Sequence, residues 1–243
     1  AKLAIDGNID VIAAGSMFSC AVTEDGALYT WGCNSEGQLG HGDCKDRAIP
    51  TKVKMLESEP VFDVACGDEF MCVMAGNNGN IYTWGSNSCG QLGHGDLKYR
   101  LKPTLVIILE KLFIKNVYAK RGISFAITDK GKVFSWGEVT NGVLGYNTNN
   151  KLQLYPKQID ALQSVNIIDI ASAQYSTFFI TKLGKVFACG SPLSHRFGIN
   201  LDSYTIKSSQ ALTLINNNIL AIFIPPLVEP PIAPKNININ NKC

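Results

Sequence analysis

The stretch LYTWGCNSEGQLGHGD at residues 28–43 returns as IYTWGSNSCGQLGHGD at residues 81–96, 53 residues further along the chain. The heptapeptide GQLGHGD is identical in the two copies. A phosphate-binding loop would end in Lys-Ser or Lys-Thr and continue into a helix, and neither copy has this ending. A repeated structural unit explains the identity better.

A Trp-Gly pair marks a period of 52 or 53 residues along most of the chain, with cysteine in place of the last tryptophan: Trp31, Trp84, Trp136 and Cys189. A second series of glycines keeps the same spacings: Gly26, Gly79, Gly131 and Gly184. One unit is therefore copied at least four times. We expect repeats at about residues 9–59, 60–113, 114–164 and 165–216.

Each unit is expected to form four β-strands. In the first unit, FSCAVT alternates in polarity with the period of a strand, and Asp25-Gly26 is suited to a tight hairpin turn. The apolar run IDVIAAG precedes this hairpin, and a further strand begins at Pro50, where proline is tolerated on a sheet edge. The glycine heptapeptide is then the connector between the third and fourth strands.

Four-stranded units with little helical periodicity are typical of the blades of a β-propeller. The predicted fold is all-β, with about four blades in residues 1–216. Ile219 has the spacing of a fifth repeat, but the five prolines that follow it cannot donate ladder hydrogen bonds. We expect residues 217–243 to be an aborted fifth repeat and a disordered, Pro/Asn-rich tail.

The units lack the Trp-Asp ending of WD blades and the Gly-Gly pair of kelch blades. They resemble the regulator of chromosome condensation repeat family at residues 13–43 and 65–96, and more weakly at residues 125–147 and 178–200. This resemblance implies a seven-bladed propeller, so four blades would form a partial ring. Since the chain begins at Ala1, without a methionine, it is expected to be a fragment or a processed product.

Basic residues recur in the predicted connectors: Lys45, Lys98 and Lys151 are repeat mates, and Arg47 matches Arg100. Equivalent loops of a propeller lie on one face, so these cations should form an arc. The arc is either a solvated loop edge or a docking site for an acidic protein surface or DNA phosphates.

Two further pairs of polar residues repeat within the heptapeptide, namely His41 with His94 and Asp43 with Asp96. A structural role in the turn is the main interpretation, because an active site seldom occurs twice in one chain. The alternative places these residues in a partner-binding rim with the five basic residues. The expected structural repeat positions are Trp31, Trp84, Trp136, Gly40, Gly93, Gly145 and Gly198.

The eight cysteines include no Cys-x-x-Cys pair, so no metal or other cofactor is predicted. Cys20 and Cys72 hold equivalent inward positions, where cysteine acts as a small apolar side chain. Cys189 leaves volume where the other units have tryptophan, so the fourth blade should pack less well.

A formal charge of +2, from 22 basic and 20 acidic side chains, gives no overall field for nucleic acid or membranes. The longest apolar runs are too short to span a bilayer. We expect a cytoplasmic or nuclear protein with a protein partner, no membrane contact and at most a weak DNA or chromatin contact through the basic loops.

No nucleophile with a neighbouring base is visible, and the three histidines form no triad, which disfavours catalysis. The sequence favours a non-catalytic protein-interaction scaffold. The resemblance implies an alternative, guanine-nucleotide exchange on a Ran-like small GTPase together with chromatin association. The founding member uses a protruding β-hairpin for exchange, and these units show no such insertion. Photoreception, known for a plant relative, is disfavoured because its Gly-Trp-Arg-His-Thr signature is missing at residues 15–19, 67–71 and 121–125.

Overall fold

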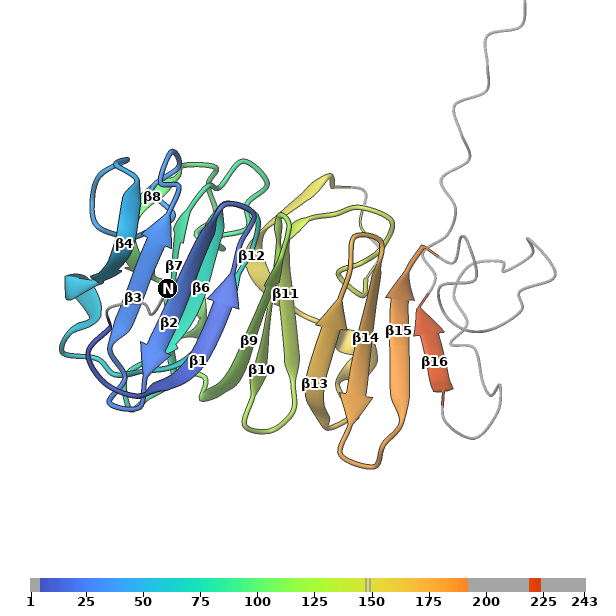
Figure 1. Ribbon diagram of the computed structural model, residues 1–243. Coiled ribbons are helices and arrows are strands. Elements are labelled where there is room, and N and C mark those ends of the chain that lie inside the picture. The colour runs from blue at the N-terminus through green and yellow to red at the C-terminus, as the bar shows by residue number, and fades with distance from the viewer. Residues whose placement is uncertain (1–4, 147, 149, 192–218, 224–243) are drawn as a thin grey trace, which may run out of the picture.

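The hairpin expected around Gly26 joins strands β2 (Phe18–Thr23) and β3 (Leu28–Gly32), with Ser19 opposite Trp31. It lies at the centre of a sheet with the order β1-β2-β3-β4, where β1 is Ile9–Ala14 and β4 is Arg47–Lys52. The computed structural model describes residues 5–146, 148, 150–191 and 219–223. In these residues the same sheet is built four times in sequence order (Figure 1).

The second sheet contains β5 (Val61–Cys66), β6 (Phe70–Ala75), β7 (Asn80–Gly85) and β8 (Arg100–Leu105). The third contains β9 (Ile114–Lys120), β10 (Ile123–Thr128), β11 (Val133–Glu138) and β12 (Leu152–Gln158). The fourth contains β13 (Ile167–Ser172), β14 (Ser176–Thr181), β15 (Val186–Gly190) and β16 (Ile219–Phe223). The predicted all-β fold with four four-stranded blades in a partial ring is therefore confirmed.

The outermost strand of each of the first three blades contains the repeated proline: Pro50, Pro103 and Pro156. These strands are sheet edges, so the missing N–H of proline costs no ladder bond. In the first blade the pairing with β3 is irregular between Thr30 and Gly32, beside Trp31. The same irregularity recurs in the second and third blades, so each tryptophan lies at a bulge.

Strand β16 differs from its expected place. Its spacing predicts the first strand of a fifth repeat, whereas the structure pairs it with β15 as the fourth strand of the fourth sheet. It runs parallel to β15, unlike the antiparallel fourth strands of the other blades. The edge of β15 offers unpaired backbone groups that a nearby strand can satisfy in either direction. The rest of the predicted segment 217–243, and Gly198, lie outside the described residues.

Short 3-10 turns connect the outer strand of one blade with the inner strand of the next. These turns are η1 (Lys54–Leu56), η2 (Ile107–Leu109) and η3 (Asp160–Leu162). Each buries one leucine. All three lie at the end of the sheets opposite the glycine loops (Figure 1).

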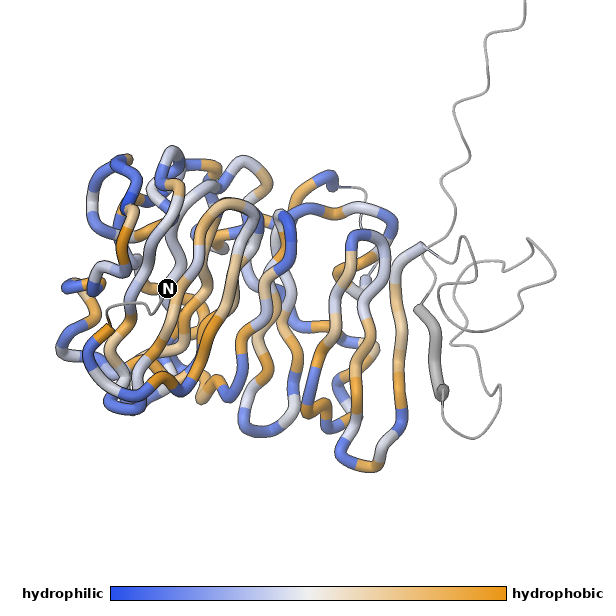
Figure 2. Tube along the Cα trace, viewed as in Figure 1, coloured by the Kyte–Doolittle hydropathy of each residue, from blue (hydrophilic) through white to orange (hydrophobic). Residues whose placement is uncertain are grey.

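The hydrophobic core lies between the blades. Apolar side chains follow the strands, and the connectors are mostly hydrophilic (Figure 2). Cys20 packs with Val73 and Trp84 between the first two blades, and Cys72 packs with Trp136 between the next two. Both cysteines are buried, at the inward positions that the repeat predicts. Each sheet therefore needs its neighbours to cover its faces.

The fourth blade compensates for the missing tryptophan with a larger residue elsewhere. Cys189 is fully buried, and Phe179 is fully buried at the position that Ala126 holds in the third blade. The Phe179 ring meets Phe125 edge-on, with 6.2 Å between ring centroids. The expectation that the fourth blade packs less well than the others stays a prediction.

Candidate functional site

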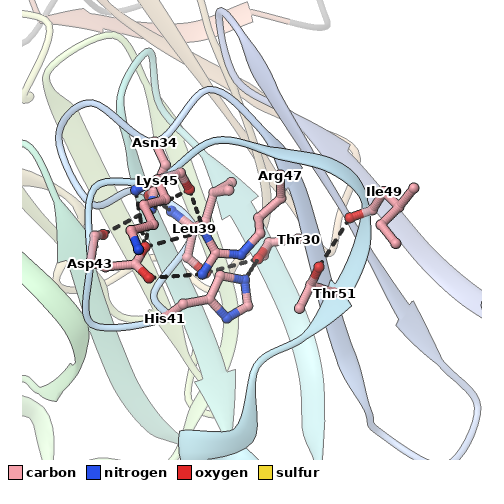
Figure 3. A network of polar contacts seen from close by, with 9 residues as sticks. All are labelled: Thr30, Asn34, Leu39, His41, Asp43, Lys45, Arg47, Ile49 and Thr51. Atoms are coloured by element: carbon pink, nitrogen blue, oxygen red, sulfur yellow. Dashed lines mark hydrogen bonds and ion pairs between the residues drawn. The ribbon is translucent and has the colours of Figure 1, made fainter.

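The glycine loop of the first blade, residues 33–46, is organised around one buried amide (Figure 3). Asn34 donates from Nδ2 to the carbonyls of Asp43 (2.8 Å) and Lys45 (3.1 Å), and its Oδ1 accepts the N–H of Leu39 (2.9 Å). Asn87 makes the same three contacts in the second loop, with distances of 2.8, 3.1 and 3.0 Å. The asparagine therefore fixes the path of the loop from inside.

Sequence reasoning missed these two asparagines, although a signal for them exists. Each lies three residues after the repeated tryptophan, and the two copies are 53 residues apart. The third unit has Val139 at this position, and its backbone N–H donates to the carbonyl of Lys151 instead.

An ion pair closes each of the first two loops. Arg47 donates to Asp43, with 2.9 Å between Nη2 and Oδ2, and Arg100 does the same to Asp96 at 2.8 Å. The hydrogen bond from Arg47 holds the pKa of Asp43 down, at about 2. The guanidinium of Arg47 also donates to the carbonyl of Lys45. These four members of the predicted rim are thus paired within their own loops.

The histidines also face inward. Nε2 of His41 lies 3.0 Å from the hydroxyl of Thr30, which donates to the carbonyl of Leu39 at 2.8 Å. Because that hydroxyl has only one hydrogen, Nε2 must carry the hydrogen and donate to Thr30. Burial lowers the pKa of His41, so a neutral ring is favoured. These contacts favour the structural interpretation of the histidine position.

The second and third loops vary this arrangement. His94 bonds Thr83 at 3.0 Å, and burial lowers its pKa to about 4. In the third loop Tyr146 replaces the histidine, and its hydroxyl donates to the carbonyl of Ser135 at 3.1 Å. In all three loops an aromatic ring at this position is therefore hydrogen-bonded to the third strand of its own blade, whether the residue is histidine or tyrosine.

The three lysines of the predicted rim differ from the other members. Lys45, Lys98 and Lys151 are exposed, and none of them has an ion-pair partner within the described parts of the chain. They hold equivalent positions in the connectors that project from one end of three successive sheets (Figure 1). The structure thus leaves these three charges available on one face.

The same end of the sheets carries further charges that the sequence reasoning missed. Lys120, the last residue of β9, and Arg121, in the turn before β10, are both exposed, and Arg121 has a φ of 52°. Asp68 and Glu69 are exposed in the equivalent turn of the second blade. The loop face is therefore mixed in charge, and in the first loop the exposed Asp46 lies next to Lys45.

The glycine loops also join the blades. Nε1 of Trp84 donates to the carbonyl of Gln38 at 2.9 Å, and Nε1 of Trp136 donates to that of Gln91 at 2.8 Å. At the next interface the Cys189 thiol lies 3.3 Å from the equivalent carbonyl, that of Val143. Each glycine loop thus accepts, at one main-chain carbonyl, a hydrogen bond from the tryptophan or cysteine at the repeat position of the following blade.

This joint explains the glycine at the fourth position of the heptapeptide. Gly40 has a φ of +79°, and a Cβ there would lie 2.7 Å from Nε1 of Trp84. Gly93 has the same φ, and its Cβ would lie 2.9 Å from Nε1 of Trp136. Gly145 also has a positive φ, but its nearest neighbour is Ile159, because Cys189 stands where the tryptophan would be.

Trp31 is the exception among the three tryptophans. It is half-buried, and its indole N–H has no acceptor in the part of the chain that the structure describes. Ile12 on the same blade is 77% exposed, whereas its counterparts Val64, Val117 and Ile170 are buried. Among the described residues, no loop covers this face of the first blade, whereas the other blades each receive one.

The described residues contain no group of three or more His, Cys, Asp or Glu side chains placed to hold a metal ion. Within the same residues, no helix has the length and apolar character needed to cross a membrane.

Comparisons with known proteins identify relatives along most of the chain. A family model described as the RCC1-like domain matches residues 2–223. The chain is 37% identical over 181 residues to the human E3 ubiquitin-protein ligase HERC2, covering 74% of this chain and 4% of that protein. It is 35% identical over 208 residues to the Arabidopsis thaliana ultraviolet-B receptor UVR8, covering 85% of this chain and 47% of the receptor.

Among solved structures, Prp20p from Saccharomyces cerevisiae is 26% identical, with a TM-score of 0.63. The similarity covers 75% of this chain and 44% of that chain. This chain therefore spans less than half the length of each of these three proteins.

Proposed function

Because the chain belongs to the RCC1-like domain family, we propose that it is a non-catalytic protein-binding scaffold whose loop face docks an acidic partner surface. The family relationship supports a propeller that acts by binding. The match to the ubiquitin ligase covers the RCC1-like region, which is a small part of that enzyme. The proposed site of action is the cytoplasm or nucleus, without a membrane or a cofactor.

The observation that carries this proposal is the contrast between the lysines and their neighbours. Asp43, Arg47 and His41 are held by contacts inside the loop. Lys45, by comparison, is exposed and unpaired among the described residues, as are its repeat mates Lys98 and Lys151. A repeated charge that the fold does not use is available to a partner, and an acidic surface is its complement.

A matched pair of charge variants tests the docking face. The variant K45Q/K98Q/K151Q removes the arc, and the control K54Q/K111Q/K130Q removes three exposed lysines from the opposite end of the sheets. Partners captured by the parent chain at low salt should be lost with the first variant and kept with the control. Equal capture by all three proteins would contradict the docking face.

A second candidate function is guanine-nucleotide exchange on a Ran-like small GTPase. The likeness to Prp20p supports it, since that protein binds Gsp1p and histones. Against it, the third-to-fourth strand connectors of the first two blades have the same length and carry no additional hairpin.

Loss of a fluorescent guanine nucleotide from a purified Ran-like GTPase separates the two functions. A scaffold should bind the GTPase, or leave it unbound, without changing nucleotide release. An exchange factor should accelerate release at substoichiometric amounts.

Any contact with DNA through the lysine arc should weaken steeply as salt is raised and should be absent from K45Q/K98Q/K151Q.

A further inference from the structure

Two cysteine sulfurs from different blades meet at the first interface. Cys20 lies on β2 and Cys66 is the last residue of β5, 46 positions later, with 3.6 Å between their Sγ atoms. Cys20 is buried, whereas Cys66 is only partly buried. The two sulfurs are thus in contact across the interface, and Cys66 is the residue of the pair that keeps some exposure.

This contact does not recur at the other described interfaces. At the second interface the equivalent residues are Cys72 and Ala119, and at the third they are Phe125 and Ser172. The repeat therefore does not require sulfur at either position, since alanine, serine and phenylalanine fill the same places. Only the interface of the first two blades brings two thiols together within the described chain.

We propose that Cys20 and Cys66 are an oxidation site that a peroxide converts into an inter-blade disulfide. The Cys66 sulfur attacks hydrogen peroxide, an S–O bond forms as the O–O bond breaks, and the product is a sulfenic acid and water. The Cys20 sulfur then attacks the Cys66 sulfur, and the S–S bond forms as the S–O bond breaks and a second water leaves. Two thiols lose two electrons in total, and one peroxide is reduced to two waters.

The geometry suits the second step. The sulfurs must approach by about 1.6 Å to reach the usual disulfide length of about 2.05 Å. Contact with Cys20, together with burial, raises the pKa of Cys66, so the reduced pair is uncharged and packs as apolar side chains. Oxidation should consequently be slower than that of the exposed Cys44.

The disulfide would fasten the first blade to the second from inside the interface. At present the loop of the first blade is held by the Trp84 hydrogen bond to Gln38 and by the Gly42 N–H bond to the carbonyl of Leu101. A covalent link adds a constraint that also acts on the unfolded chain. The oxidised protein should therefore resist separation of these blades.

The test is peptide mapping of the folded chain after treatment with hydrogen peroxide at low protein concentration. The expected product is a monomer that contains a Cys20–Cys66 linked peptide, with a melting temperature raised by about 5 °C and restored by a reducing agent. The variant C66A, which copies Ala119 of the third blade, should give neither the peptide nor the shift. The control C72A should give both.

Two results would overturn the proposal. One is a chain whose Cys20 and Cys66 are still reduced, as shown by alkylation after unfolding, when peroxide treatment has been carried on until Cys44 is fully oxidised. The other is linkage of Cys66 to Cys72 instead of Cys20. Because C66A introduces a residue found at the same position in another blade, its folding can be checked directly by circular dichroism.

Discussion

Trp84 of the second blade donates its indole N–H to the main-chain carbonyl of Gln38 in the first, at 2.9 Å, across 46 residues of sequence. The repeated tryptophan and the repeated glycine loop therefore form one hydrogen-bonded joint between neighbouring blades. The identical heptapeptides reflect this joint, since each has the same indole to accommodate.

Replacing Trp84 by alanine should destabilise the chain by about 3–5 kcal/mol, because a large, fully buried side chain and its hydrogen bond are both lost. Trp31→Ala should cost less, about 1–2 kcal/mol, since Trp31 is half-buried and unpartnered among the described residues. Urea unfolding of both variants measures the difference. Equal losses would contradict the joint.

Gly40→Ala should cost more than Gly184→Ala. Both glycines have a positive φ, +79° and +75°, so both changes strain the backbone by about 1 kcal/mol. A Cβ at Gly40 also meets Trp84, whereas nothing lies within 4 Å of a Cβ at Gly184. We expect an additional loss of about 1–3 kcal/mol at Gly40 from overpacking, measured by chemical denaturation. A similar loss at Gly184 would contradict the close approach.

Asn34→Ala should destabilise the chain by about 2–4 kcal/mol, because the buried amide makes three hydrogen bonds to loop backbone groups. Asn8→Ala is the matched control, since Asn8 is exposed and bonds only the side chain of Glu24. Denaturation curves should separate the two variants. Asn34→Ala should also increase hydrogen exchange at the amide of Leu39, and unchanged exchange there would count against the loop bonds.

The His94 ring gives a pH dependence with a defined window. Its pKa of about 4 lies below the ordinary value of 6.5, mainly because burial disfavours the charged ring. The unfolded chain therefore binds the proton first as pH falls, and stability should decline between pH 6.5 and about 4. His94→Gln should lose less stability across this interval. Melting temperatures measured from pH 7 to 4 provide the check, and parallel curves would exclude His94 as a cause.

The repeat, its four-stranded units and the glycine connectors were predictable, because equivalent residues recur at a fixed spacing. Periodicity identifies which residues are equivalent, but it does not show which groups bond to each other. Arg47 and Asp43 were predicted as charges of a partner-binding rim, but the two side chains form an ion pair with each other. Sequence spacing alone could not reveal this pairing. The parallel pairing of β16 depends on an open sheet edge, a property of the assembled fold.

The joint between blades also gives the array a direction. Each of these blades carries the accepting loop carbonyl on the side that faces the next blade and the tryptophan on the side that faces the preceding blade. Neighbouring blades therefore all stack in the same orientation. Trp31 and the exposed Ile12 lie on the face of the first blade that no other described blade covers, and a loop like the one that Gln38 offers to Trp84 would complement that face.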